Sequence, residues 1–333
     1  MKRKTLLTII QYVIFLGLGI LLIVHMSNQM SAKDKADMME SIRQTRLLYL
    51  IPIFIAGFLS HFFRALRWKL LLRPLEIRPT TANTLFSVLI GYLVNLLVPR
   101  LGEVAKCTVL ARYENVPADK MIGTIVAERA FDVVTLCVVI LLAFTTQAHI
   151  IGSYAANLFG AVAAKSGSII IVIAILIAII AVLIFIYRSN RNSKVGKFIK
   201  GLADGIRSIL IMEKRGQFLL YSVLIWMMYW SQVYIGFHSL PVTEHLPGLA
   251  ALVVLVFGSV GMIVTPGGIG AYPLLIAQIL TFYGLSISAG NAFGWVSWAV
   301  QAGIIIILGI VSLILLPLYN TKKHDAQTAM DTE

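Results

Sequence analysis

The chain has 333 residues, of which 59 % are hydrophobic and 13 % are charged, and its mean hydropathy is +0.87. This composition excludes an ordinary soluble domain and indicates a polytopic membrane protein. The formal net charge of +13 is interpreted as a topology signal, because Lys and Arg concentrate on the cytoplasmic side of membranes, and no nucleic-acid partner is expected. Cys107 and Cys137 imply no disulfide framework, and no metal cluster or cofactor-binding loop is visible.

The N-terminal unit, residues 1–46, begins with Lys2-Arg3-Lys4 and continues into a long apolar run. A signal peptide has a shorter apolar region and a small-residue cleavage site, so residues 5–26 are predicted to be an uncleaved first span. Residues 27–46 carry a balanced set of charges and are predicted to be a short external amphipathic segment.

The next span, residues 47–67, leads into a basic cluster that includes Arg64 and Arg67. The cluster marks the cytoplasmic face, and Trp68 suits the aromatic belt at a membrane interface. If the apolar segment 80–98 then crossed the membrane, the basic stretch 188–215 would be external, against the positive-inside rule.

We therefore predict a re-entrant hairpin over residues 80–112, which enters from the cytoplasm, breaks at Pro99–Glu103 and returns. The span 119–146 then leads outward and completes a first repeat over residues 47–146. A linking unit, residues 147–216, contains a span over 168–187 and an amphipathic segment predicted to lie on the cytoplasmic leaflet.

A second repeat is predicted over residues 217–320, followed by a cytoplasmic tail over 321–333. Its spans are 217–238 and 292–317. Between them, the apolar run 249–284 is interrupted by Pro266, Gly267, Gly268 and Gly270, which disfavour a continuous helix. The loops on both sides of this run carry no Lys or Arg, so we predict a second re-entrant hairpin that enters from outside.

The fold class predicted is thus an all-α polytopic membrane protein, with about six full spans and two re-entrant broken-helix hairpins in an inverted repeat. Irregular backbone at membrane depth survives only where it is buried in protein or faces a water-filled cavity. Secondary transporters place their substrate site where two such breaks meet. The alternative is that both segments are ordinary kinked helices.

The first break, with Pro99, Arg100, Gly102 and Glu103, places charge deep in the membrane, where it requires a partner or a cavity. Arg100 and the N-terminus of the following half-helix could bind a phosphate or carboxylate. Alternatively, Arg100 pairs with Glu103 and only holds the hairpin tip together. Lys106 could guide a phosphate or could extend its amine to the interface.

A second ionisable group, Glu128, Arg129 and Asp132, lies within the span 119–146. Glu128 and Asp132 share one helix face, and Arg129 neighbours Asp132. These groups could relay protons or bind a cationic moiety, or they could form a buried ion-pair network with the first hairpin. Arg64 and Arg67 could likewise capture an anionic head group or act only as a topology signal.

The remaining polar candidates are weaker. His61 and His238 are lone histidines near span ends and receive no predicted role. Five aromatic residues within the spans could line a cavity or serve as packing residues; they are Tyr229, Trp230, Tyr234, Trp295 and Trp298.

In combination, these motifs resemble the lysylphosphatidylglycerol synthase transmembrane-region family, also described as flippase-like. The resemblance covers about residues 47–317 and rests on four motifs in order: Arg64/Arg67/Trp68, Asn95 with Pro99/Arg100/Gly102/Glu103, Glu128/Arg129/Asp132, and Pro266/Gly267/Gly268/Gly270. The chain departs from the family pattern at Lys106, where relatives often have Arg, and at Pro273, where they often have Glu.

The resemblance implies movement of an anionic or zwitterionic phospholipid, glycophospholipid or polyprenyl-linked lipid between leaflets. Its head group would contact Asn95, Arg100, Glu103, Lys106 and the other charged motif residues. The full synthases also carry a soluble aminoacyl-transferring domain, and since this chain ends at Glu333 we expect no catalytic residues and no enzyme activity. We expect location in the plasma (inner) membrane with both termini cytoplasmic. The alternatives are an accessory subunit of a glycosyltransferase or other lipid-modifying enzyme, and a small-solute transporter.

Overall fold

The computed structural model describes residues 17–98, 101–148, 150, 207–209 and 211–331. Every regular element in this part of the chain is a helix, as the composition predicts. Residues 17–29 are helical and precede the labelled elements. These elements are α2 (Ala32–Arg43), η1 (Leu47–Tyr49), α3 (Leu50–Leu72), η2 (Arg73–Leu75), α4 (Thr81–Leu97), α5 (Leu101–Glu114), α6 (Ala118–Thr146), α11 (Arg215–Ser239), α12 (Gly248–Val264), η3 (Pro266–Gly268), α13 (Ala271–Thr281) and α14 (Ile287–Asp331).

Three helical stretches of the described residues are long and apolar enough to cross a membrane: Leu47–Leu75, Arg215–Ser239 and Ile287–Thr321. They correspond to three of the predicted spans. Many large apolar side chains on their outer faces are exposed, among them Ile51 and Ile314. Since soluble monomers rarely expose such extended apolar surfaces, these faces suit contact with lipid. The predicted span 168–187 and most of the predicted amphipathic segment 188–215 lie outside the described residues.

The short segment predicted between the first two spans forms helix α2. Its N-terminus is closed by a capping box, in which Asp34 N–H donates to Ser31 Oγ at 3.1 Å and Ser31 N–H donates to Asp34 Oδ2 at 3.0 Å. The Ser31 hydroxyl and N–H lower the pKa of the Asp34 carboxyl from its ordinary value. Such caps satisfy N–H groups that a helix start leaves without partners.

Helices α4 and α5 cover most of the segment 80–112 and pack antiparallel against each other. At the open end, the Glu114 carboxylate accepts from the N–H of Thr80 at 2.8 Å. Near the break, a Cβ added to Gly91 would lie 2.9 Å from the carbonyl oxygen of Gly102, so the absence of side chains permits this close approach. Gly102 N–H donates to Asn95 Oδ1 at 2.8 Å, which caps the start of α5. Pro99 and Arg100 lie outside the described residues.

Helices α12, η3 and α13 cover most of the apolar run 249–284. The break predicted at the Pro-Gly-Gly stretch is confirmed, because Gly267, Gly268 and Gly270 have positive φ angles of 61°, 74° and 75°. Trp298 of α14 donates its indole N–H to the carbonyl of Gly267 at 2.7 Å. Thr265 Oγ1 donates to the carbonyl of Ile269 at 2.9 Å. Side chains thus provide hydrogen bonds to backbone carbonyls that have no helical hydrogen-bond partner at the break.

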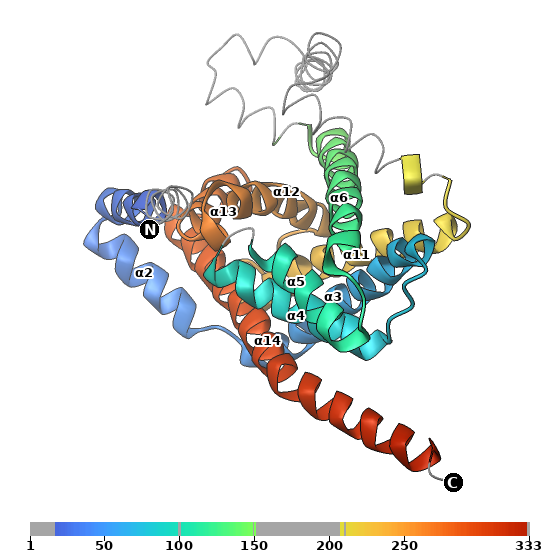
Figure 1. Cartoon of the computed structure of the whole chain (residues 1–333). Coiled ribbons are helices and arrows are strands. Elements are labelled where there is room, and N and C mark those ends of the chain that lie inside the picture. Colours follow the sequence, from blue (N-terminus) through green and yellow to red (C-terminus); the bar gives the residue numbers. More distant parts are fainter. Residues whose placement is uncertain (1–16, 99–100, 149, 151–206, 210, 332–333) are drawn as a thin grey trace.

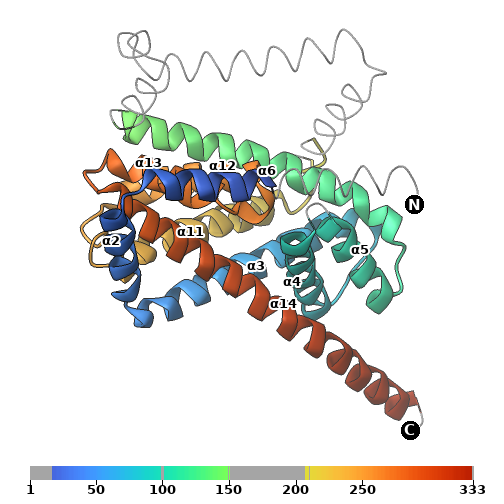
Figure 2. The ribbon, with the colours of Figure 1, turned by 90° about the vertical axis from the view of Figure 1, so that its left-hand side faces the viewer.

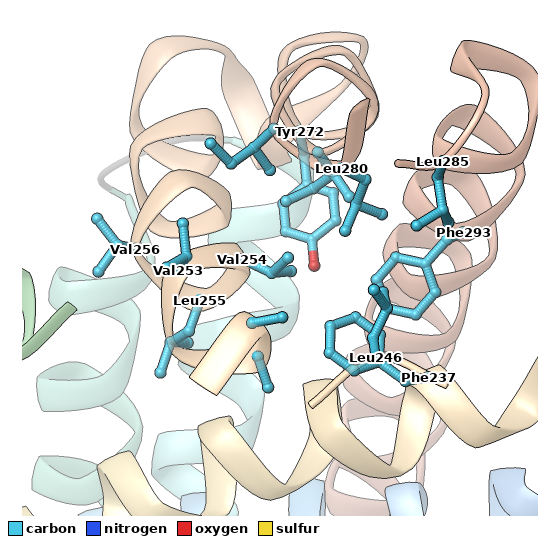
Figure 3. Close-up of a cluster of buried hydrophobic side chains, with 14 of the residues drawn as sticks. Phe237, Leu246, Val253, Val254, Leu255, Val256, Tyr272, Leu280, Leu285 and Phe293 are labelled. Carbon is cyan, nitrogen blue, oxygen red and sulfur yellow. The ribbon is translucent and has the colours of Figure 1, made fainter. Parts of the chain in front are cut away.

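A large hydrophobic cluster fixes the second hairpin against α14. Figure 3 shows Tyr272 and Leu280 of α13 lying between Val253 and Val254 of α12 on one side and Phe293 of α14 on the other. All five side chains are buried. The break is therefore held between two packed helices and does not act as a free loop.

The same pairs of elements pack in both halves of the chain. In the first half, α3 contacts α4, α4 contacts α5, and α5 contacts α6; α11, α12, α13 and α14 make the corresponding contacts in the second half. Helix α14 packs on α4 and α6 packs on α12 (Figures 1 and 2). Helices α3 and α11 run antiparallel, as shown by contacts of Arg46 N–H with Ser239 O and of Arg67 with Ser222.

The C-terminal end of α4 meets the second break. Helix α4 contacts η3, and a Cβ added to Gly267 would lie 3.2 Å from the side chain of Leu96. Residues 17–29 also reach the second break, where the carbonyl oxygen of Gly19 lies 2.5 Å from the Cβ position of Gly270. Helix α14 extends past the predicted span 292–317 and past Pro317, and its C-terminal end projects beyond the other helices (Figure 1). Proline is tolerated inside membrane helices. The helix therefore continues beyond the point where the apolar stretch of the sequence ends.

The glycine contact in the first hairpin gives a testable prediction. In Gly102→Ala, the new Cβ would collide with the carbonyl of Gly91 and the side chain of Asn95. We expect the substitution to lower the free energy of unfolding by about 1–3 kcal/mol, measured by thermal unfolding of the purified protein in detergent. The matched control is Gly123→Ala on α6, where nothing lies within 4 Å of the Cβ position, so wild-type or slightly higher stability is expected. Equal melting of Gly102→Ala and wild type would contradict the packing of α4 on α5.

Candidate functional site

Two arginines of α3 and two carboxylates of α6 form the centre of a buried charge network. Arg64 Nη1 lies 3.2 Å from Glu128 Oε1 and 2.9 Å from Asp132 Oδ2. Arg67 Nη2 lies 3.3 Å from Glu128 Oε1 and 2.6 Å from Asp132 Oδ1. Because both carboxylates contact the same two guanidinium groups, the prediction that they share one face of a helix is confirmed.

Lys106 of α5 joins this network from the first hairpin. Its Nζ lies 2.8 Å from Glu128 Oε2 and 4.1 Å from the centre of the Trp68 ring. The Lys106 side chain is 9 % exposed and its amine is paired with Glu128, so of the two alternatives considered for it, extension of the amine to the interface is excluded. The placement of Trp68 in an interfacial belt is also wrong, because its ring is fully buried and its indole N–H donates to Thr124 Oγ1 at 2.9 Å. Trp68 instead provides an aromatic face for a buried cation.

Arg129 is the exposed member of the network. Its Nη2 lies 2.6 Å from Glu103 Oε1, and its Nη1 lies 3.7 Å from Asp132 Oδ2, which confirms the predicted neighbourhood of Arg129 and Asp132. The Arg129 side chain is 46 % exposed, against 7 % for Arg64 and 0 % for Arg67. The partner considered for Glu103 from the sequence, Arg100, lies outside the described residues.

The network carries more positive than negative charge. Its cations are Arg64, Arg67, Lys106 and Arg129, and its carboxylates are Glu103, Glu128 and Asp132, so four positive charges face three negative ones. The network ties α3, α5 and α6 together, as the ion-pair alternative anticipated. The side chains of Arg64 and Arg67 point into the protein, so their role extends beyond a charge signal at the membrane surface.

A cavity of about 310 Å³ opens beside this network. It lies among α3, α11, α12 and α14, and it is reached by Tyr92 of α4, Arg129 of α6 and Tyr272 of α13. Arg64 and Arg129 are the charged side chains in its described lining, and no carboxylate is among them. Tyr229, one of the predicted cavity aromatics, lines it and accepts from Arg64 Nη2 at 2.8 Å. The cavity volume lies in the range of small-ligand sites, so it suits a head group better than a whole lipid.

Uncharged polar side chains line the same cavity and were missed from the sequence. They include His61, Gln232, Ser259 and Gln301. His61 Nδ1 is buried and has no hydrogen-bond partner among the described residues, although the ring packs 4.5 Å from that of Tyr92. The available signal was a polar residue within an apolar span, which is itself a functional-site indication.

The anion site proposed from the sequence at the start of the half-helix stays a prediction, because backbone N–H groups at both breaks have partners within the protein. The N–H of Gly102 donates to Asn95, and the N–H groups of Gly268 and Ile269 donate to Thr265 and Pro266. These three groups are therefore occupied within the protein. The described cavity lining does not include Pro266–Gly270. It includes Met262 of α12 and Tyr272 of α13, which lie on either side of this break in the sequence.

Comparison with known proteins agrees with this architecture. Residues 8–309 match the family model described as "Lysylphosphatidylglycerol synthase TM region". The chain belongs to this family. It is also 22 % identical over 337 residues to a UPF0104 membrane protein of Methanothermobacter thermautotrophicus, a match that covers 94 % of the chain and 96 % of the relative. No solved structure matches the chain.

The charge network of this member of the lysylphosphatidylglycerol synthase transmembrane-region family yields a second prediction. Glu128→Gln removes the carboxylate that Arg64, Arg67 and Lys106 share. Since uncompensated buried charges are strongly destabilising, we expect a loss of about 3–5 kcal/mol in the free energy of unfolding, measured by thermal unfolding in detergent.

The control is Glu244→Gln, which breaks the exposed pair of Arg46 and Glu244, with side-chain exposures of 46 % and 44 %. Exposed pairs contribute about 0–1 kcal/mol, so this variant should melt close to wild type. The double variant Lys106→Met with Glu128→Gln removes one of the surplus cations and should recover part of the loss. Indistinguishable melting of the two single variants would contradict the buried network.

Proposed function

We propose that the protein is a lipid transporter that moves an anionic or zwitterionic phospholipid, glycophospholipid or polyprenyl-linked lipid between the two leaflets. The head group would pass through the central cavity while the acyl or prenyl chains stay in the bilayer. The protein would not change the covalent structure of the lipid. Membrane lipids are thus its proposed partners.

The observation that carries this proposal is the cavity lined by Arg64 and Arg129 and by no described carboxylate. The exposed guanidinium of Arg129 makes one short contact, with Glu103, while its Nη1 lies 3.7 Å from Asp132 Oδ2. A phosphate oxygen could therefore approach Nη1 and form a charge-assisted hydrogen bond. Arg100 stays a predicted phosphate ligand at the first break.

The proposed architecture is an inverted repeat of residues 47–146 and 217–320 with two re-entrant hairpins. It is supported by the matching helix contacts of the two halves, by the antiparallel course of α3 and α11, and by the contact of α4 with η3. Transporters built this way bind substrate between their paired breaks and expose it alternately to the two sides.

The proposed location is the plasma (inner) membrane with both termini cytoplasmic. The support is the distribution of Lys and Arg in the sequence, above all in the stretch 188–215 and after the last span. This topology places the loop at Asn115 in the cytoplasm and the loop at Glu244 outside.

Cysteine labelling of intact cells tests this topology. After replacement of Cys107 and Cys137 by Ser, single cysteines are introduced as Asn115→Cys and Glu244→Cys, at positions exposed in the structure. A membrane-impermeant maleimide should label the second variant in intact cells and the first only after permeabilisation. Labelling of Asn115→Cys in intact cells would contradict the first re-entrant hairpin.

Lipid movement is tested with purified protein in liposomes that contain fluorescent phosphatidylglycerol in both leaflets. Dithionite reduction reports how fast lipid from the inner leaflet reaches the outer one. Arg129→Gln should reduce the protein-dependent rate about tenfold or more, because a charge-assisted contact with the phosphate is lost. Glu103→Gln should keep the rate at or above wild type, since it leaves the guanidinium available.

The matched control is Arg46→Gln, since Arg46 has the same 46 % exposure and the same 2.6 Å contact with a glutamate but lies outside the described cavity lining. It should retain the wild-type rate. Equal rates for wild type, Arg129→Gln and protein-free liposomes would overturn the transport proposal. Equal and fast rates for wild type and Arg129→Gln would overturn the role of Arg129.

A further inference from the structure

The side chains that line the cavity change from charged to uncharged polar along its length. On α3, His61 precedes Arg64 by three residues, and on the antiparallel helix α11, Gln232 follows Tyr229 by three residues. A rise of about 1.5 Å per residue places both neutral groups about 4.5 Å from the Arg64 level, towards the same end of the cavity. The cationic end is therefore followed by the uncharged polar side chains of His61 and Gln232. Ser60 of α3, Ser259 of α12 and Gln301 of α14 also line the cavity, and we call these five residues the polar wall.

The hydrogen-bonding capacity of this polar wall is largely unused within the described residues. Gln301 has no hydrogen bond there, and the amide of Gln232 makes one long bond of 3.4 Å to the carbonyl of Met228. Ser60 and Ser259 donate to carbonyls of their own helices, which leaves their oxygens able to accept. His61 Nδ1 is buried without a described partner on a residue that is 6 % exposed. Groups that can both donate and accept suit hydroxyl groups.

The charged groups around the cavity disfavour a cationic guest. Arg64 and Arg129 line it, and the nearby carboxylates Glu103, Glu128 and Asp132 are already bound to cations. Glu103 and Glu128 do line a neighbouring pocket, but its volume of about 10 Å³ is close to that of a single water site. Glu103 Oε2 has no described hydrogen-bond partner, but it is buried and Glu103 lines only this small pocket. An ammonium group in the larger cavity would therefore meet two guanidinium groups and no carboxylate of the described lining.

We infer that the polar wall is a hydroxyl-binding subsite, so that the cavity selects a phosphodiester head group with free hydroxyls, such as glycerol or a sugar, and rejects an aminoacylated, cationic one. This inference rests on the proposed function, because the phosphate is assigned to the same Arg64 and Arg129 end. The phosphate lies at the guanidinium groups, and the hydroxyls bind to the polar wall, where Gln232 lies one helical turn further along and Gln301 contributes from α14. His61 contributes its ring to the same wall.

Binding of short-chain lipids to the purified full-length protein tests this inference by calorimetric titration. The probes are dihexanoyl phosphatidylglycerol, dihexanoyl phosphatidylethanol, dihexanoyl lysylphosphatidylglycerol and free glycerol 3-phosphate. Phosphatidylethanol has the same phosphodiester charge as phosphatidylglycerol but no free hydroxyl. We expect the wild type to bind phosphatidylglycerol about tenfold more tightly than phosphatidylethanol, and lysylphosphatidylglycerol most weakly of the three lipids.

Gln232→Leu and Gln301→Leu should bring the ratio of phosphatidylglycerol to phosphatidylethanol affinity close to one, with the affinity for phosphatidylethanol unchanged. The control is Gln217→Leu, the same substitution at an exposed position of α11, which should keep the wild-type ratio. The comparison of ligands on wild-type protein keeps the test valid even if a variant fails to fold.

The outcomes separate this inference from the proposed function. Equal wild-type affinities for phosphatidylglycerol and phosphatidylethanol, or tightest binding of lysylphosphatidylglycerol, would overturn the hydroxyl subsite and leave lipid transport standing. Glycerol 3-phosphate binding as tightly as the short-chain phosphatidylglycerol would support the subsite but assign it to a free solute and overturn lipid transport. Binding of none of the four probes would overturn both.

Discussion

The structure depends on the carboxylate of Glu128, which is 3 % exposed and lies within 3.3 Å of Arg64, Arg67 and Lys106. A buried carboxylate is stable only when cations and hydrogen-bond donors surround it. These donors come from α3 and α5, so the Glu128 contacts fix the positions of α3 and α5 relative to α6. Arg64 and Arg129 of this network, which has one cation more than carboxylates, line the cavity.

The two hairpins solve a related problem for the backbone. A chain that breaks its helix inside a membrane must satisfy the freed N–H and C=O groups from its own side chains. Asn95 does this for Gly102, while Trp298 and Thr265 do it for Gly267 and Ile269. Close glycine contacts bring the helices near enough for these bonds to form. At the second break, these bonds and the N–H bonds of Gly268 and Ile269 hold the non-helical backbone against the neighbouring helices.

The sequence predicted those features that depend on periodicity and on helix breakers. The i, i+4 spacing placed Glu128 and Asp132 together, and the Pro-Gly-Gly stretch located the second break. It did not predict the inward direction of Arg64, Arg67 and Trp68, because charge near a span end was interpreted through membrane topology, whereas tertiary pairing with α6 decides the direction. Gln232, Gln301 and His61 were passed over because one neutral polar side chain in a span carries a weak signal, and their convergence appears only when α3, α11 and α14 pack together.

Stability alone does not account for a buried network with more cations than carboxylates. Replacement of buried ion pairs by well-packed apolar residues is often neutral or stabilising, so such networks are not an efficient way to hold helices together. The network is also graded, from the fully buried Arg67 to the half-exposed Arg129, which faces the cavity. A purely structural cluster would have no reason to leave its surplus charge at a cavity wall. The grading is the arrangement expected where a phosphate completes the charge balance on one side and neutral amides, one helical turn away, contact the rest of the head group.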